Sequence, residues 1–267
     1  MATADHTTEL PSYNNPPLDE VACGCQFRTL DRVRLPHYGT FWDSLRKDFP
    51  TIVHVPPMFN GEGMPPLDSA TSLPLPRVWF LNEDESRLLQ FQQDRLYFNW
   101  RKRNGAEYPR FEEIYRSFIE NYTRLSTFAS DMQLGPIQPT EFELSYINHL
   151  VKGEGWDKLE DFSKIFKDFR LLPDDNRFLG IPSGISLNAT YPLPNEQGTL
   201  NVKVTQGKRS IDSVDIYSFD LSVRGITLDL SESGIRAWFD LAHEWIVRGF
   251  TDLTTSEIQY STWGRKK

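Results

Sequence analysis

The stretch Arg95-Leu96-Tyr97-Phe98-Asn99-Trp100-Arg101 alternates apolar and polar side chains with a period of two residues. This period is typical of a β-strand, because successive side chains of a strand point to opposite faces of the sheet. The apolar face would carry Leu96, Phe98 and Trp100, and the polar face would carry Arg95, Asn99 and Arg101. We therefore predict a strand with one buried face and one polar face.

Two more strand patterns precede this stretch. Residues 77–81 and 87–92 are separated by the polar turn Asn82-Glu83-Asp84-Glu85, and Gln93-Asp94 leads into the third strand. Short turns of this kind favour an antiparallel meander. After Pro109, apolar residues recur at helical spacing from Phe111 to Met132, and Gly135-Pro136 follows. We predict a long amphipathic helix that packs on the meander.

The remaining elements follow from the same two periods. Strand patterns lie at residues 19–30, 141–148, 185–191, 199–205 and 214–224, and helical patterns lie at 36–49, 157–169 and 232–251. Residues 54–76 hold six of the 18 prolines and two glycines, so a long loop is predicted there.

No regular strand–helix–strand repeat occurs, which predicts an α+β fold. We expect a mainly antiparallel, curved sheet of about eight strands with helices packed on one face. Residues 1–17 read as a flexible N-terminal tail, and residues 18–267 read as a single domain. The element order is compatible with two similar halves, 18–134 and 135–267.

Composition limits the function classes. The net charge of −8 disfavours nucleic acid as a partner. The two cysteines, Cys23 and Cys25, lie too close in a strand for a disulfide, which suits a reducing, cytoplasmic location. No apolar run is long enough to cross a membrane.

Searches for catalytic motifs give only fragments. His243-Glu244 lacks the second histidine of a zinc protease, because Val247 stands at that position. Glu141 and Glu143 share a strand face, but no third acid at a fixed spacing accompanies them. We expect no metal and no cofactor, and the sequence leans against an enzyme.

The candidate binding site combines the polar row of residues 95–101 with the strand at 141–148. Arginine is suited to bidentate capture of a carboxylate or phosphate. The candidate residues are Arg95, Asn99, Arg101, Glu143, Tyr146 and Asn148. A purely structural alternative is that the arginines only pair with acids such as Glu143 across the sheet.

Several local strings together resemble a sporadically distributed family of bacterial proteins of unknown function. They are Leu10-Pro11-Ser12-Tyr13, Asn15-Pro16-Pro17, residues 95–101, Tyr108-Pro109-Arg110-Phe111, residues 140–148, Gly153-Glu154-Gly155-Trp156 and Trp263-Gly264-Arg265. The resemblance spans nearly the whole chain. It implies a prokaryotic cytoplasmic protein, and a patchy distribution suits an accessory role such as defence against mobile elements.

Two functions of different classes remain open. The first is a non-catalytic interaction or scaffold protein that docks a protein partner, or a further copy of itself, through its polar sheet face or the loop at 54–76. The second is a sensor, or an enzyme of unfamiliar type, that binds an anionic small molecule or nucleotide between the two halves. Binding of single-stranded nucleic acid is a third reading, which the acidic charge disfavours.

Overall fold

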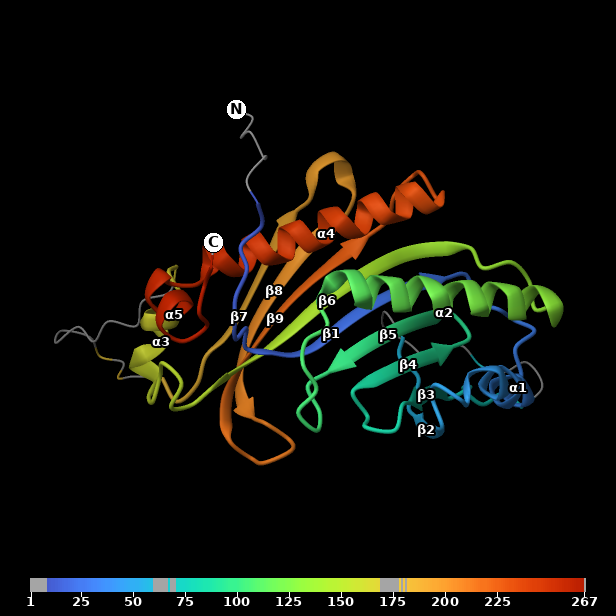
Figure 1. The fold of residues 1–267 in the computed structure, drawn as a ribbon, viewed down its shortest axis with the longest axis horizontal. Helices are drawn as coiled ribbons and strands as arrows, with labels where there is room; N and C mark the ends of the chain where they lie inside the picture. Colours follow the sequence, from blue (N-terminus) through green and yellow to red (C-terminus); the bar gives the residue numbers. More distant parts are fainter. Residues whose placement is uncertain are drawn as a thin grey trace. The chain divides into compact units, whose positions relative to one another are not determined.

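A computed structural model describes residues 9–59, 67, 71–168, 178, 180 and 182–266. The fold is α+β, with one open, antiparallel sheet of nine strands and helices packed against it (Figure 1). The strand order is β2-β3-β4-β5-β1-β6-β9-β8-β7. The predicted fold class is confirmed, with one strand more than the eight expected.

The strands are β1 (Leu18–Phe27), β2 (Thr51–Val55), β3 (Arg77–Leu81), β4 (Arg87–Gln92), β5 (Arg95–Arg101), β6 (Pro139–Val151), β7 (Ser186–Pro192), β8 (Thr199–Lys208) and β9 (Asp215–Gly225). The helices are α1 (Leu35–Leu45), α2 (Phe111–Asp131), α3 (Phe162–Ile165), α4 (Glu232–Leu253) and α5 (Ser256–Ser261), with short 3₁₀ turns at Leu159–Asp161 and Pro194–Glu196.

The chain divides into two compact units, which are described separately. The N-terminal unit comprises Glu20–Ser145 and Arg224–Leu228, and the C-terminal unit comprises the residues up to Asp19, Tyr146–Val223 and the residues from Asp229 onward. The central strands β1 and β6 are neighbours in the sheet. On the far side of β1 lie β5, β4 and β3 in that order, and on the far side of β6 lie β9, β8 and β7. Each run is a meander that precedes a long helix in the chain. The pseudo-repeat of residues 18–134 and 135–267 stays a prediction.

In the N-terminal unit, the apolar face of the meander forms the core. Leu96, Phe98 and Trp100 are buried as predicted, and α2 packs against β5 (Figure 1). Helix α1 covers β3 and β4, where the ring of Phe41 lies 5.5 Å from that of Phe91. Buried rings on both helices explain why this aromatic-rich sequence needs no cross-link.

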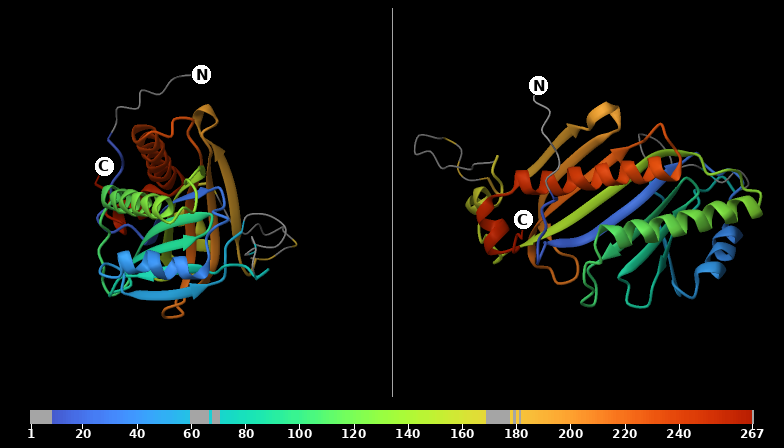
Figure 2. Two further views of the ribbon diagram at one scale, coloured as in Figure 1. Left: turned by 90° about the vertical axis from the view of Figure 1, so that its right-hand side faces the viewer. Right: turned by 45° about the horizontal axis from the view of Figure 1, so that its top comes forward.

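In the C-terminal unit, α4 lies along β8 and β9 (Figure 2). The Phe250 ring of α4 stacks on Phe219 of β9 at 5.6 Å. Trp238 and Phe239, which the helical period predicts on the buried side, are almost fully buried. Burial of this apolar stripe holds the helix on its strands.

Three predictions need correction. The helix predicted at 157–169 is only a 3₁₀ turn followed by α3, because the chain becomes extended at Phe166, which pairs with Thr254. Phe169 lies outside the described residues. The long loop predicted at 54–76 begins inside β2, and residues 60–66 and 68–70 of it also lie outside the described residues.

The third correction concerns the predicted tail at 1–17. Tyr13 is buried, forms a β-bridge with Arg265 and shares a hydrogen bond of 2.8 Å with Thr251. Its ring meets those of Phe250 and Trp263 edge to face. A large aromatic side chain gains enough from burial to order its segment, so this part of the predicted tail is packed. Residues 1–8 lie outside the described residues.

Candidate functional site

The face of β5 that points away from α2 carries Arg95, Tyr97, Asn99 and Arg101. The pairing of β5 with β4 and β1 fixes their neighbours, because directly paired residues point to the same face. Gln92 and Gln26 flank Arg95, and Gln90 and Gly24 flank Tyr97. The side chains of this polar face of the N-terminal unit therefore form rows that run across β4, β5 and β1.

Arg95 is almost completely buried, with 2% of its surface exposed. Its Nε and Nη2 atoms each donate to the Asp94 carboxylate at 3.0 Å. Burial alone would lower the pKa of Arg95, but the hydrogen bonds and charge of Asp94 outweigh it and raise the pKa. The third guanidinium nitrogen, Nη1, is buried and has no hydrogen-bond partner among the described residues. The structural alternative was pairing of the arginines with acids such as Glu143 across the sheet; the acid that binds Arg95 directly is Asp94, and Glu143 acts on Arg95 through its charge.

Asn99 and Arg101 also have protein partners. The Asn99 amide donates to Glu20 and accepts from Gln90 at 2.8 Å. Arg101 donates through Nε and Nη2 to the main-chain oxygen of Glu85 at 3.2 and 2.9 Å. Its guanidinium lies 5.9 Å from the centre of the Trp79 ring, within the range of a cation–π contact. These bonds hold the polar row in place.

Glu143 of β6 lies at the centre of a second group on this face. Its carboxylate accepts from the Tyr97 hydroxyl at 3.0 Å, from Ser145 at 2.7 Å and from Arg224 Nη2 at 3.1 Å. Burial, and then the negative charge of Glu143, raise the pKa of Tyr97 well above its ordinary value. The Glu143 carboxylate therefore ties three side chains together on the polar face.

Tyr146 and Asn148 do not join this group. They follow Glu143 at odd spacings of three and five residues, so strand alternation directs them to the opposite face of β6. The Tyr146 ring lies 6.0 Å from His243 of α4, and Asn148 donates to the Phe219 carbonyl at 2.9 Å. The six predicted site residues therefore divide into four on the polar face and two on the helix-covered face.

Sequence reasoning missed several members of the polar face. Arg77 at the start of β3 donates to Gln90 at 2.9 Å and to the sulfur of Met58. Burial, and then the charge of Arg95, lower the pKa of Arg77. The signal was present in the alternation of Arg77 and Trp79 with buried Val78 and Phe80.

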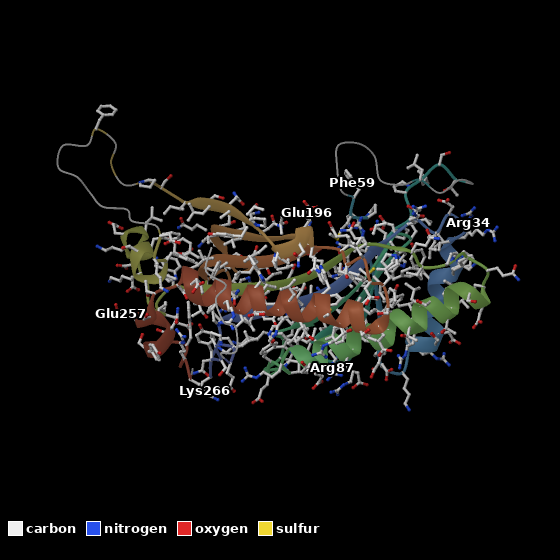
Figure 3. The ribbon with its side chains drawn as sticks, turned by 90° about the horizontal axis from the view of Figure 1, so that it is seen from above. Arg34, Phe59, Arg87, Glu196, Glu257 and Lys266 are labelled. Atoms are coloured by element: carbon white, nitrogen blue, oxygen red, sulfur yellow. The ribbon has the colours of Figure 1, made fainter. Side chains whose placement is uncertain are left out.

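Met58 connects the segment after β2 to this face. Its main-chain N–H donates to the Gln92 side chain at 2.8 Å, and its carbonyl accepts from the same side chain at 2.7 Å. Gln92 is 1% exposed and also donates to Asp94 at 2.8 Å. Figure 3 shows Phe59 on the side of this unit away from α2, whereas Arg87 lies on the side of α2. The start of the proline-rich segment thus lies over the polar face.

The two other groups considered in the sequence, Glu141 with Glu143 and the cysteine pair, are also placed by the structure. Glu141 accepts a hydrogen bond of 2.6 Å from Gln26, and burial raises its pKa. Cys23 and Cys25 are fully buried free thiols. Over the described ranges, no three histidine, cysteine or acidic residues come together as a metal site would require.

The polar residues of β7, β8 and β9 form a separate surface in the C-terminal unit. These strands are neighbours, and Asn188 pairs with Lys203 while Thr190 pairs with Asn201. Thr190 and Asn201 also share a hydrogen bond of 3.1 Å. The polar alternations of this region therefore line one sheet face, which is the usual arrangement of a solvated antiparallel sheet.

Comparisons with protein-family models, with curated proteins and with solved structures find no match. In the part of the chain that the structure describes, no helix combines the length and hydropathy of a membrane span. The candidate site thus has to be interpreted from its own geometry.

Proposed function

We propose that this protein is a non-catalytic interaction protein that docks a partner protein on the polar face of its N-terminal unit. The feature recognised on the partner is an acidic segment. The role in a bacterial accessory system, such as defence against mobile elements, is part of the proposal and rests on the sequence resemblance alone.

One observation carries the proposal. Within the part of the chain that the structure describes, Arg95 Nη1 is buried without an acceptor, and the residue as a whole is only 2% exposed. A buried donor with no acceptor costs about 1–3 kcal/mol, and more when the group is charged, so such atoms are rare unless a ligand or water completes them. An anionic group from a partner would supply the missing acceptor and offset this cost.

The surroundings of Arg95 favour binding over catalysis. Two nearby carboxylates hold donors of this face: Asp94 holds Arg95, and Glu143 holds Arg224 and the Tyr97 hydroxyl. Guanidinium and amide donors dominate this face, and these groups recognise anions without transferring protons.

The test uses two arginines with similar side-chain exposure, each in an ion pair. The side chain of Arg224 is 42% exposed and pairs with Glu143 at 3.1 Å on the polar face. The side chain of Arg87 is 50% exposed and pairs with Glu113 at 3.0 Å on the α2 side. Affinity purification from the native host would compare the wild-type protein with Arg224→Glu and Arg87→Glu.

The proposal predicts a stoichiometric protein partner that co-purifies with wild type and with Arg87→Glu but not with Arg224→Glu. Circular dichroism would verify that all three proteins are folded. Equal recovery of the partner with both variants would overturn the assignment of the docking face.

A second candidate function is the recognition of an anionic small molecule or nucleotide. The observation that favours it is the depth of Arg95, because a small anion reaches a buried guanidinium with less rearrangement than a chain segment does. Native mass spectrometry of the freshly purified protein separates the two candidates: a retained metabolite of fixed mass favours the sensor, and its loss in Arg95→Lys would place it at this face.

A further inference from the structure

We propose that Arg77 and Arg95 together bind one carboxylate group, which identifies the chemical class of the anion. This inference rests on the proposed function and extends it, because it selects an aspartate, glutamate or C-terminal carboxylate over a phosphate.

The two arginines belong to one row across the sheet. Gln92 of β4 pairs directly with Arg95 of β5. On the other side of β4, Val78 of β3 pairs with Phe91. The next pair in this antiparallel register places Arg77 opposite Gln92. Neighbouring strands lie about 4.8 Å apart, and paired residues point to the same face. Arg77 and Arg95 therefore flank Gln92 on the polar face, and the positive charge of Arg95 lowers the pKa of Arg77.

Among the residues that the structure describes, each arginine has one buried nitrogen without an acceptor. In Arg95 this atom is Nη1, and in Arg77 it is Nε. Arg77 Nη1 donates to the Gln90 side-chain oxygen and to the sulfur of Met58, and neither acceptor is charged. A carboxylate has two oxygens, so a single carboxylate can accept from one donor on each guanidinium group.

The charge balance selects the anion. Arg77 and Arg95 contribute two positive charges and Asp94 contributes one negative charge. Glu143 also acts on Arg95, but it has Arg224 as its own ion-pair partner. The row is thus left with one positive charge, which a carboxylate neutralises. A phosphate ester carries about −1.5 to −2 at pH 7 and would leave excess negative charge beside Asp94.

Met58 covers this row. Its main chain is held by two hydrogen bonds with the Gln92 side chain, and its sulfur accepts from Arg77 Nη1. The Nη1 atom is thus already engaged, and the carboxylate takes the Nε atom of Arg77.

The Arg77 Nε–H group is itself a spectroscopic probe. Side-chain ¹⁵N–¹H spectra of the full chain, assigned with Arg77→Lys, would be recorded during titration with sodium acetate and with phosphate at constant ionic strength. We expect the Arg77 Nε–H signal to move saturably with acetate, and phosphate to bind at least about tenfold more weakly. The Arg87 signal serves as an internal control, because Arg87 already pairs with Glu113.

Arg95→Lys keeps the charge and removes the planar fork, so we expect its affinity for acetate to fall about tenfold. Absence of saturable movement at Arg77, equal movement at Arg87, or tighter binding of phosphate would each overturn the inference. The proposed function has a separate test. It is overturned if Arg224→Glu recovers the protein partner as well as wild type does, whether or not acetate binds at Arg77.

Discussion

The ring of Tyr97 lies directly on the backbone of Gly24, its partner across β1 and β5. A Cβ atom added to Gly24 would stand 2.1 Å from the Cδ1 atom of Tyr97, far inside any allowed contact. The missing side chain of Gly24 therefore makes the space in which Tyr97 lies flat and donates to Glu143. A glycine on one strand thus positions a hydroxyl that anchors the polar face.

Gly24→Ala should destabilise the protein by about 1–3 kcal/mol, because the new methyl group forces the Tyr97 ring out of its position. Gly39 in α1 offers a matched control, since nothing lies within 4 Å of its added Cβ. Gly39→Ala should be neutral or stabilise by up to about 1 kcal/mol. Urea unfolding of both variants measures the difference, and equal stabilities would disprove the packing described for Tyr97.

Arg95→Ala and Arg101→Ala should differ in their effect on stability. Removal of Arg95 leaves the carboxylate of Asp94 without its bidentate partner, which should cost about 3 kcal/mol. Arg101 is only partly buried and bonds to a carbonyl, so its loss should cost under about 1 kcal/mol. Thermal and urea unfolding would measure both; equal losses would contradict the burial assigned to Arg95.

The free energy of unfolding should fall as the pH rises above 10. Burial raises the pKa of Tyr97 well above its ordinary value and raises that of Tyr217 to about 12. In the unfolded chain these groups lose their protons near pH 10, whereas in the folded chain they retain them. The unfolded state then binds fewer protons, so stability falls with pH. Tyr97→Phe should reduce this slope by up to about 1.4 kcal/mol per pH unit, and urea titrations from pH 8 to 11 that show an unchanged slope would refute the prediction.

Phe118→Ala should cost about 3–5 kcal/mol, because the Phe118 ring of α2 is 1% exposed in the core of the N-terminal unit. Leu228, in the same unit, is fully exposed, and Leu228→Ala should change stability by less than about 0.5 kcal/mol. A loss below about 1 kcal/mol for Phe118→Ala in urea unfolding would show that this helix face is not packed as described.

Strands with one buried face were predictable, and a fully exposed strand was not. The bounds predicted for β3, β4 and β5 are confirmed to the residue, because apolar and polar side chains alternate between short polar turns. Strand β2 was missed because its residues are exposed on both faces and leave no alternation to detect. Alternation of apolar and polar residues arises because one face of a strand is buried. An edge strand with little buried surface therefore shows no such alternation.

The candidate site was predictable in part. The polar row of β5 followed from its alternation. The same alternation, applied to β6, would have separated Glu143 from Tyr146. Arg77 required the register between β3 and β4, which local sequence does not determine.

The central claim is that a partner protein contacts the polar face of the N-terminal unit, and photo-crosslinking from β2 tests it most directly. Val53 pairs with Trp79, which pairs with Gln90, so Val53 belongs to the polar face; Ile52 pairs with Phe80 and belongs to the opposite face. Both residues are 37% exposed. A photoreactive phenylalanine at position 53 should crosslink the co-purifying partner through an acidic segment, and the same residue at position 52 should not. Equal crosslinking from both positions, or crosslinking from position 52 alone, would contradict the account.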